Sequence, residues 1–532
     1  IAMRDGVLLR GDLWLPEGAG PHAAIIFRTP YNRAVFVSDF LSPQQAAEAG
    51  FAVVVQDCRG RFRSDGHWRP LMWEQEGEDS YDTVEWAAAQ PWCSGAVGMA
   101  GPSYMGVVQI AGAMLKPPHL KAIAPAICSV ARHESPETGG AFWLDHLFGW
   151  TALMTADWAE KQRAAGVIVS DQSATTLALA VGDPCTLMEH RPLCQSPLFD
   201  LPNFDISFER LSGECATPDM DVREIDIAVL SSGGWHDLYV RGAIGLFTDA
   251  PPGAERRMIM GPWLHSATPS GQAGQLDFGT GAGAFDAGLH LDHLAFFRRH
   301  LLGENVDIVP VRYFLMNANV WRSSAIWPPE DMKVRQLFLR AGGTLSPDAP
   351  TDREKENRYR FDPSDPTPTV GGRTMPAFTV AAGPIDQAAL AGRSDLLLYD
   401  ADPTDQPVDI VGTISATIFV QADVPSFDVV VKLVDVAPDG VALPITDGIR
   451  RIFARANCDG FVPVDVHLAD TAWRLLPGHH LRVQVQSGNY PHFDANPGTG
   501  NPLGTDAEGC VANIAIAHAP GAASRIAFGG PG

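Results

Sequence analysis

Residues 95–106 restrict most strongly what this chain can fold into. Residues 97–100 are a short apolar run typical of a buried strand, and the run ends at Gly101. A second apolar run, with helical spacing, starts at Val107. A strand that gives way to a helix so quickly needs small residues at the crossing, and Ser103 lies in the corner. The pattern predicts a sharp strand-to-helix turn that lifts a serine hydroxyl out of a sheet. The strict motif is G-x-S-x-G, whereas here Gly106 comes one place late.

Strands and helices alternate around this turn. Besides 97–100, the predicted strands are residues 23–27, 51–56, 120–124, 225–230, 257–260 and 309–316, and the predicted helices are residues 44–49, 74–89 and 290–302. Short Val, Ile and Ala runs separated by helices indicate a mostly parallel sheet that is covered on both faces. We therefore expect an α/β fold for this part of the chain.

At 532 residues the chain is too long for one domain. We expect an α/β-hydrolase domain in two parts, residues 1–132 and 223–331, separated by a helical cap over residues 133–222. After residue 331 the apolar period changes to two, with predicted strands at 336–340, 414–420, 428–435 and 482–486. Residues 332–532 are therefore expected to form an all-β sandwich of the jelly-roll type.

Charge and composition exclude several classes of partner. The net charge of −23 argues against binding to nucleic acid or to an anionic membrane surface. No run of eighteen apolar residues predicts a membrane span. We expect a soluble protein, cytoplasmic rather than secreted, although a removed signal peptide and a homo-oligomer both stay open. No pattern calls for a cofactor or a metal, and none is expected. A disulfide among Cys185, Cys194 and Cys215 also stays open.

Polar side chains cluster just past the carboxyl ends of the predicted strands, where open α/β sheets bind their ligands. Ser103, Asp237 and His265 occur in the order serine, acid, histidine that is typical of α/β-hydrolases. Serine is a weak nucleophile that needs an adjacent base, a role for His265, and Asp237 would orient the imidazole. The amide of Tyr104 and the hydroxyl of Tyr31 are the candidate oxyanion donors. The hypothesis is a serine hydrolase.

Other polar residues compete for these roles. His236 adjoins Asp237 and is an alternative base, although it precedes the acid. His290 and His293 lie three apart on a predicted helix and could form a metal pair, but no third ligand is evident, so a solvated helix surface is the simpler interpretation. The Asp57-Cys-Arg-Gly60 segment is interpreted as a turn held by an internal ion pair.

Five ordered motifs carry a family resemblance. They are Arg28-Thr-Pro-Tyr31, Gln56-Asp-Cys-Arg-Gly60 with Ser64-Asp-Gly66, Gly101-Pro-Ser-Tyr-Met-Gly106, Gly234-Trp-His-Asp237 and Gly261-Pro-Trp-Leu-His265. Together they resemble the cocaine esterase / X-prolyl dipeptidyl-peptidase family of serine hydrolases. In that family the second glycine of the serine motif also comes one place late. The resemblance spans nearly the whole chain and implies an α/β-hydrolase domain, an inserted helical cap and a C-terminal jelly roll. It implies Ser103, Asp237 and His265 as the triad, and Tyr31 and Tyr104 as the oxyanion hole. It also implies Tyr239 and Trp150 as lining of the acyl pocket.

The same resemblance leaves the substrate open among esters, peptides with a proline before the cleaved bond, and β-lactams or α-amino esters. The peptidases and amino-ester enzymes need carboxylates to hold a substrate ammonium, and only single acids such as Glu134, Glu137 and Asp145 are candidates in the cap. The aromatic content of residues 142–154 favours a bulky, apolar acyl group. We therefore predict a carboxylesterase acting on a small-molecule ester through an acyl-enzyme, with an amidase or peptidase as the alternative. A non-catalytic carbohydrate-binding protein that uses the jelly roll is a third hypothesis.

Overall fold

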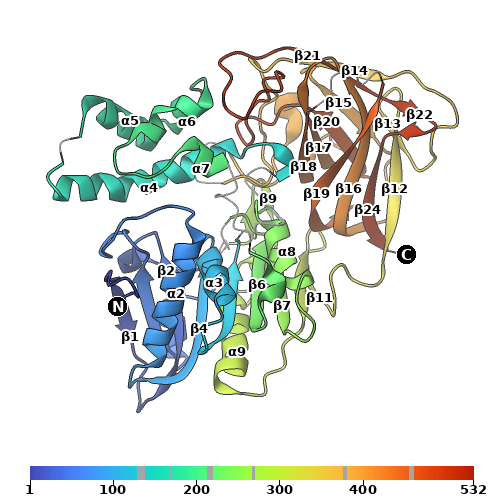
Figure 1. The fold of residues 1–532 in the computed structure, drawn as a ribbon. Coiled ribbons are helices and arrows are strands. Elements are labelled where there is room, and N and C mark those ends of the chain that lie inside the picture. Colours follow the sequence, from blue (N-terminus) through green and yellow to red (C-terminus); the bar gives the residue numbers. More distant parts are fainter. Residues whose placement is uncertain are drawn as a thin grey trace.

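The structure, a computed structural model, describes residues 1–128, 138–167, 169–212, 220–265, 270–375, 380–453 and 460–531. The chain forms an α/β domain, a helical cap and a β domain (Figure 1). The cap projects above the α/β domain, and the β domain stands beside both. The fold is thus the predicted one, a mixed and mainly parallel sheet with a helical insert, followed by a mainly antiparallel β domain.

The α/β domain is built on one nine-stranded sheet with the order β1-β3-β2-β4-β5-β6-β7-β10-β11. Its strands are β1 (Gly11–Trp14), β2 (His22–Thr29), β3 (Ala52–Asp57), β4 (Cys93–Pro102), β5 (Leu120–Ala126), β6 (Ala228–Gly234), β7 (Arg256–Gly261), β10 (Val311–Leu315) and β11 (Val320–Ser324). Strands β2 to β7 and β10 run parallel, whereas β1 and β11 pair antiparallel at the two edges. The predicted core strands are confirmed.

One predicted strand starts later than expected. Residues 225–227 precede β6, because the guanidinium of Arg256 takes the carbonyl oxygens of Ile225 and Ile227 as hydrogen-bond acceptors. Those carbonyls are therefore used by a side chain instead of a neighbouring strand.

Helices cover both faces of the sheet. They are α1 (Pro43–Glu48), α2 (Trp73–Ala88), α3 (Tyr104–Met114), α8 (Val240–Thr248) and α9 (Leu289–Leu302). Helices α1 and α9 pack on one face through a core that includes Phe296 and Phe297, and α2 and α3 pack on the other through Val84 and Ile110. Burial on both faces explains why the strands are continuous apolar runs rather than alternating ones.

The cap leaves the sheet after β5 and returns before β6. Its helices are α4 (Leu144–Ala164), α5 (Asp171–Gly182), α6 (Pro184–Met188) and α7 (Phe208–Ser212). The first three turns of α4 are almost entirely buried, because they face the α/β domain, the other cap helices and the β domain at once. The aromatic stripe of residues 142–154 therefore forms the floor of the cap.

The β domain consists of long antiparallel strands. They are β12 (Met332–Arg340), β13 (Thr344–Ser346), β14 (Asn357–Phe361), β15 (Leu396–Asp400), β16 (Val408–Ala422), β17 (Ser426–Val436), β18 (Ala442–Phe453), β19 (Val462–Leu475), β20 (His480–Gln486), β21 (Ala512–Ile516) and β24 (Arg525–Pro531). All four strands predicted here are present, and in the described part of this domain the helical content is one 3-10 turn at Gln387–Leu390. A large apolar core joins this domain to α8 and β10.

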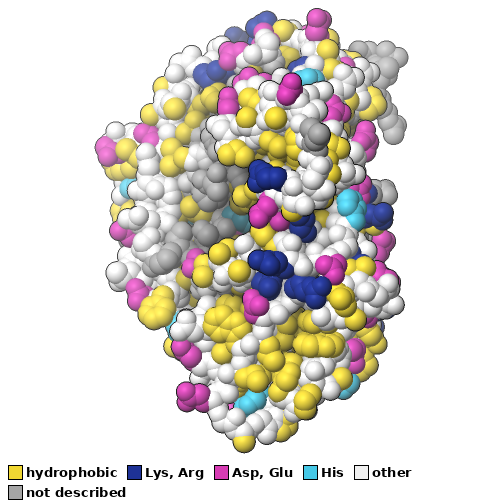
Figure 2. Space-filling view, turned by 90° about the vertical axis from the view of Figure 1, so that its left-hand side faces the viewer, with side chains coloured by type: hydrophobic (Ala, Val, Ile, Leu, Met, Phe, Trp, Pro, Cys, Tyr) yellow, Lys and Arg dark blue, Asp and Glu magenta, His cyan; other side chains and the backbone are white. Residues whose placement is uncertain are grey.

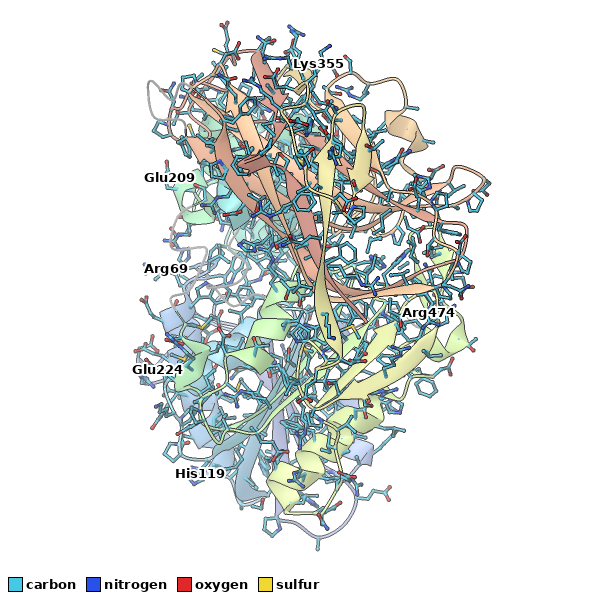
Figure 3. All side chains as sticks on the ribbon, turned by 90° about the vertical axis from the view of Figure 1, so that its right-hand side faces the viewer. Arg69, His119, Glu209, Glu224, Lys355 and Arg474 are labelled. Carbon is cyan, nitrogen blue, oxygen red and sulfur yellow. The ribbon has the colours of Figure 1, made fainter. Side chains whose placement is uncertain are left out.

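Backbone hydrogen bonds tie the two sheets together. Met316, just past β10, donates to Ala472 and accepts from Arg474 of β19. The side chain of Arg474, which lies close to the domain boundary in Figure 3, pairs with Asp409 at 2.6 Å. Arg322 of β11 reaches the same carboxylate at 3.2 Å. These links and the shared apolar core hold the β domain in a fixed place beside the α/β sheet.

The β1 edge exposes apolar side chains, with Leu13 and Trp14 each 42% exposed. Figure 2 looks onto this side and shows hydrophobic side chains gathered over its lower part, below a group of Lys and Arg side chains. No described helix is both long and apolar enough to cross a lipid bilayer. Cys185 and Cys194 are free thiols, and Cys215 lies outside the described residues.

Candidate active site

Ser103 stands at the turn between β4 and α3, in a strained conformation. Its φ of 57° and ψ of −127° are unusual for a residue other than glycine, and they lift the side chain above the sheet. Its amide donates to the carbonyl of Ala126 at 2.8 Å, which anchors the turn to β5. A Cβ on Gly106 would meet the side chain of Cys128 at 2.7 Å, so the late glycine lets α3 approach the end of β5.

His265 and Asp237 complete the predicted triad. His265 lies in the loop after β7, with its Nε2 3.0 Å from Ser103 Oγ and its Nδ1 2.7 Å from Asp237 Oδ1. Asp237 is fully buried and His265 is 8% exposed. The three side chains, far apart along the chain, therefore form one hydrogen-bonded row at the carboxyl edge of the sheet.

Backbone contacts fix the acid loop against the histidine loop. The amides of Trp235 and His236 donate to the carbonyls of Gly261 and Trp263 at 2.8 and 3.0 Å. A Cβ on Gly234 would lie 2.3 Å from the Trp263 carbonyl oxygen, so only glycine permits this approach. The two sequence motifs that contribute acid and histidine are thus packed backbone to backbone.

Tyr31 follows β2 and lies beside the serine. Its amide donates to Thr29 Oγ1 at 3.0 Å, and its hydroxyl accepts a hydrogen bond from Trp150 Nε1 at 3.2 Å. Burial raises the pKa of Tyr31, although the hydrogen bonds of its hydroxyl with Trp150 and Ser103 act in the opposite direction. Because the indole N–H occupies a lone pair, the phenolic proton of Tyr31 can point towards the serine.

In the predicted oxyanion hole, Tyr104 would contribute its backbone amide and not its side chain. Its amide belongs to the first turn of α3, where N–H groups have no acceptor within the helix. Its hydroxyl instead donates to Glu76 at 3.0 Å, and Glu76 pairs with the fully buried Arg28 at 3.1 Å. Arg28, the first residue of the first motif, thus acts through Glu76 on the side chain of Tyr104, the residue after the serine.

The cap and the acid loop form an aromatic wall at the site. Trp150 of α4 stacks on Tyr104 with 6.1 Å between ring centroids. Tyr239, two residues past the acid, lies 5.4 Å from the His265 ring, and its hydroxyl is 2.8 Å from His146 Nε2. Both pocket residues implied by the resemblance therefore lie near the predicted triad.

His146 was missed by sequence reasoning. It lies in the first turn of α4, and its ring is 6.2 Å from that of His265. Burial lowers the pKa of His146 well below its usual value, and His265 and His492 act in the same direction, so it is neutral. No spacing in the sequence links residue 146 to residue 239, because the contact exists only once the cap has docked.

The three acids that were candidates for binding a substrate ammonium do not form a cluster among the residues that the structure describes. Asp145 is fully buried, and its Oδ1 lies 3.3 Å from His492 Nδ1 of the β domain. Its amide also donates to Pro491. Glu134 and Glu137 lie outside the described residues. Asp145 thus serves the contact between cap and β domain.

The alternative residues have other roles. His236 is 2% exposed, and its side chain makes no hydrogen bond with the residues that the structure describes, whereas His265 contacts both serine and acid. His293 is buried, not solvated, and its Nδ1 lies 2.9 Å from the Leu289 carbonyl oxygen, so the expected helix-surface position was wrong. Among the described residues, no group of three or more His, Cys, Asp or Glu could hold a metal ion.

The expected internal pair of Asp57 and Arg59 was also wrong. Asp57 pairs with Arg33, and Arg59 pairs with Asp5 and Asp79 at 2.6 Å each. The two side chains therefore pair with residues from different parts of the α/β domain. The segment ties together strands and helices of the α/β domain.

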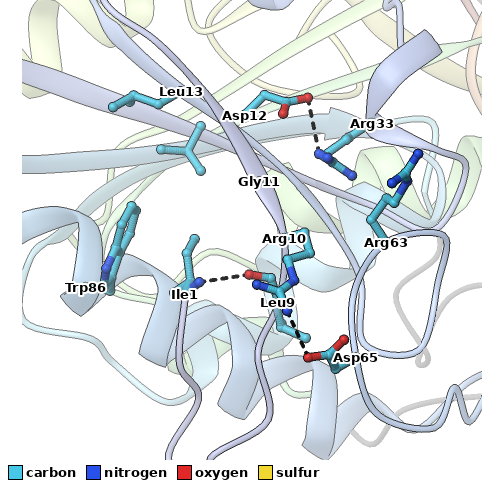
Figure 4. A pocket seen from close by; sticks show the side chains of 11 residues that line it. Ile1, Leu9, Arg10, Gly11, Asp12, Leu13, Arg33, Arg63, Asp65 and Trp86 are labelled. Atoms are coloured by element: carbon cyan, nitrogen blue, oxygen red, sulfur yellow. Dashed lines mark hydrogen bonds and ion pairs between the residues drawn. The ribbon is translucent and has the colours of Figure 1, made fainter.

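Two cavities of about 590 Å³ lie elsewhere. One is at the β1 edge, where Arg10, Arg33 and Arg63 stand near Asp12 and Asp65 (Figure 4). The other lies between the cap and the β domain. Neither is lined by Ser103, Asp237 or His265.

Comparisons with known proteins agree with this architecture. Residues 5–267 match the model of the X-Pro dipeptidyl-peptidase (S15 family), and residues 307–527 match the X-Pro dipeptidyl-peptidase C-terminal non-catalytic domain. The chain is 33% identical to the cocaine esterase of Rhodococcus sp. (strain MB1 Bresler), over 99% of this chain and 96% of the relative.

Solved structures share the fold over the full length. An aminopeptidase from a marine sediment archaeon, Thaumarchaeota archaeon, is 23% identical with a TM-score of 0.79, and covers 100% of this chain and 95% of its own. A CocE/NonD family hydrolase from Staphylococcus aureus is 18% identical with a TM-score of 0.69, over 100% of this chain and 92% of its own. The two matched regions and the full-length relative together show that this chain is a serine hydrolase that belongs to the X-Pro dipeptidyl-peptidase (S15) family.

Proposed function

We propose that this serine hydrolase cleaves carboxylic esters with bulky, mostly apolar acyl groups, through an acyl-enzyme on Ser103. The single observation that carries the proposal is the His265 imidazole, hydrogen-bonded at once to Ser103 Oγ at 3.0 Å and to Asp237 at 2.7 Å. This arrangement gives a weak nucleophile a base, and gives the base an orienting carboxylate.

In the acylation half, Ser103 Oγ attacks the ester carbonyl carbon and its proton passes to His265 Nε2. The buried carboxylate of Asp237 stabilises the resulting imidazolium. The tetrahedral intermediate then breaks its bond to the alcohol oxygen, which leaves with the proton from His265. In the second half, water attacks the acyl carbon by the same route and releases the acid.

Two donors would stabilise the developing oxyanion, the Tyr104 amide at the start of α3 and the Tyr31 hydroxyl. The contact with Trp150 supports a donor role for Tyr31. The Trp150 N–H donates to the Tyr31 oxygen, so the phenolic proton stays available for the oxyanion. Burial keeps Tyr31 in its protonated form by raising its pKa.

The surroundings of the site favour an apolar acyl group. Trp150 and Tyr239 would line the acyl pocket, with Trp143 packed behind Tyr239 at a ring distance of 5.7 Å. Neutral His146 and the engaged Asp145 offer no free charge for a substrate ammonium. The similarity to a cocaine esterase adds support for an ester substrate. An amidase or peptidase with the same triad is the alternative, because acyl-enzyme chemistry serves both bonds.

A substrate panel combined with active-site labelling tests the proposal. A fluorophosphonate should form one adduct, which peptide mass mapping should assign to Ser103. p-Nitrophenyl benzoate and butyrate should be hydrolysed with far higher kcat/KM than Xaa-Pro or α-amino-acyl p-nitroanilides. An adduct on another serine would overturn the triad assignment, and preferential cleavage of the anilides would replace the esterase by the amidase. Inertness to every ester and amide, together with glycan binding, would support the carbohydrate-binding hypothesis.

A further inference from the structure

One buried arginine, Arg61, joins the loop that carries Tyr31 to helix α4 of the cap. Arg61 is 2% exposed. Its Nε donates to the Pro30 carbonyl at 3.0 Å, and its Nη1 donates to the Met154 carbonyl at 3.3 Å. Pro30 directly precedes Tyr31, and Met154 follows Trp150 by about one helical turn. A single side chain thus reaches both backbone segments that present the partners of the Tyr31–Trp150 hydrogen bond.

The contact with α4 continues along one face of this helix. Nη1 of Arg61 lies 3.4 Å from Oδ2 of Asp157, and both side chains are buried. The same carboxylate accepts from the Phe62 amide at 3.1 Å, and Lys161 donates to the Gly60 carbonyl. Positions 150, 154, 157 and 161 lie on one stripe of the helix, because they are separated by three or four residues. Residues 60–62 therefore fix the register of α4 against this loop.

Aromatic rings fill the space between Arg61 and the oxyanion site. The guanidinium carbon of Arg61 lies 4.4 Å from the centroid of the Trp68 ring, and that ring lies 5.9 Å from the ring of Trp150. Trp150 in turn stacks on Tyr104. A cation held over an aromatic face adds attraction to the hydrogen bonds of the guanidinium. These side chains form one packed row that begins at Arg61 and ends at the residue after the serine.

Arg61 is separate from the predicted triad. Among the residues that the structure describes, its hydrogen bonds and its ion pair go to Pro30, Met154 and Asp157, and none goes to Ser103. Any influence of this arginine on the reaction therefore passes through the loop after β2 and through α4.

We propose that Arg61 is a positioning residue for the oxyanion hole, which holds the Tyr31 hydroxyl beside Ser103 by fixing the Pro30 carbonyl and α4 relative to each other. The inference rests on the proposed function, because Tyr31 is the oxyanion donor named there. An aliphatic side chain at position 61 would leave both carbonyls and the α4 carboxylate without their common partner. The loop and the cap would then move apart, and the hydrogen bond between the phenol and the cap would lengthen.

A double-mutant cycle with p-nitrophenyl butyrate tests this route. Arg61→Met should lower kcat roughly tenfold to 10²-fold with little change in KM, because a misplaced oxyanion donor acts mainly in the transition state. In the Tyr31→Phe background the same change should lower kcat by less than about threefold further, since the group that Arg61 positions is already absent. An activated ester suits the test, because an esterase and an amidase with this triad would both hydrolyse it.

Arg256→Met is the matched control. Arg256 is also buried and also donates to two backbone carbonyls, those of Ile225 and Ile227, but it lies at the start of β7, away from the carboxyl edge of the sheet. This change should lower the melting temperature as Arg61→Met does and leave kcat unchanged. If Arg61→Met does not fold, the cycle is run with Arg61→Lys, because lysine keeps the charge but lacks the planar group that joins two carbonyls. The same pattern in kcat is expected.

An unchanged kcat in the position 61 variant would overturn the inference and leave the proposed function intact. Losses in the variants of Arg61 and Tyr31 that multiply would do the same, because the arginine would then act by another route. An equal loss of kcat in Arg256→Met would also overturn it, since general destabilisation would explain the effect. If Tyr31→Phe alone left kcat unchanged, the oxyanion assignment itself would fail, and Arg61 would have no donor to position.

Discussion

Two regions of this molecule bury polar and charged side chains, and they use them differently. At the carboxyl edge of the α/β sheet, the row from Asp237 through His265 ends on the Ser103 hydroxyl, which faces the cap. At the seam between cap and β domain, Arg451 is bracketed by Asp428 at 2.7 Å and Asp494 at 3.0 Å. The first network is open at one end, so a substrate can complete it, whereas the second closes on itself.

The closed network around Arg451 connects the cap to the β domain. Asp494 also accepts from the amide of Phe142 at 2.9 Å, and its own amide donates to the Phe142 carbonyl at 3.0 Å. The residues that lead into α4 are thereby attached to the β domain. The comparison teaches that burial of charge alone does not identify a reactive site, and that an unfilled end of the network does. Changes at either region should therefore separate chemistry from stability.

Ser103→Ala should have the largest effect, a loss of roughly 10⁶ in kcat, because the nucleophile and its base act as a unit. The change removes the open end of the first network and leaves the protein folded. Steady-state hydrolysis of p-nitrophenyl butyrate measures the loss, and an unchanged melting temperature is the control. Retention of more than a small fraction of the activity would mean that another group is the nucleophile.

Arg451→Met should lower the free energy of unfolding by about 3–5 kcal/mol, because it leaves two buried carboxylates without their cation. Burial already raises the pKa of Asp428 against the effect of Arg451, so its charge depends on this partner. Denaturant unfolding measures the change. Arg450→Met, at the exposed neighbouring position of β18, should alter stability by no more than about 0.5 kcal/mol. Equal effects of the two changes would contradict the contrast between the two networks.

Tyr31→Phe should reduce kcat by roughly 10²–10³ with little change in KM, since an oxyanion donor acts mainly in the transition state. Tyr81→Phe on α2 is the control, because its hydroxyl has no hydrogen bond among the described residues and its loss should leave kcat unchanged. If Tyr31→Phe instead raised KM and lowered the melting temperature, the hydroxyl would have a packing role.

His293→Gln should make stability less sensitive to acid. Burial lowers the pKa of His293 to about 4, from about 6.5 in the unfolded chain. As the pH falls from 6.5 towards 4, the unfolded chain takes up a proton that the folded chain does not, so the free energy of unfolding decreases. This histidine accounts for up to about 3 kcal/mol of that loss.

Urea unfolding of the His293→Gln variant at pH 7 and pH 5 measures this slope. His236 is also buried and titrates in the same direction, with a pKa of about 3, so part of the acid sensitivity should remain in His293→Gln. An unchanged slope in that variant would place the acid sensitivity in other groups.

The sequence alone determined which strands the motifs follow, the turn that carries the serine, and the residues of the predicted triad. Each of these is local, because a strand, its terminal turn and the following polar residue are neighbours in the chain, and parallel strands bring their carboxyl ends to one edge. The partners of Asp57 and Arg59, the burial of His293 and the role of Asp145 were not predictable in this way. Those side chains reach partners from other elements, which only the packed structure brings near.

The tertiary structure by itself decided the wall of the site and the contact between the acid loop and the β domain. His146 meets Tyr239 because the cap docks over the acid loop, and Arg373 meets the Leu238 carbonyl because the β domain packs against the same loop. No periodicity or spacing encodes such contacts, since residues 146 and 373 lie far along the chain from the residues that they meet. Local chemistry thus determined where a reaction is expected, and the docking of cap and β domain decided what surrounds it.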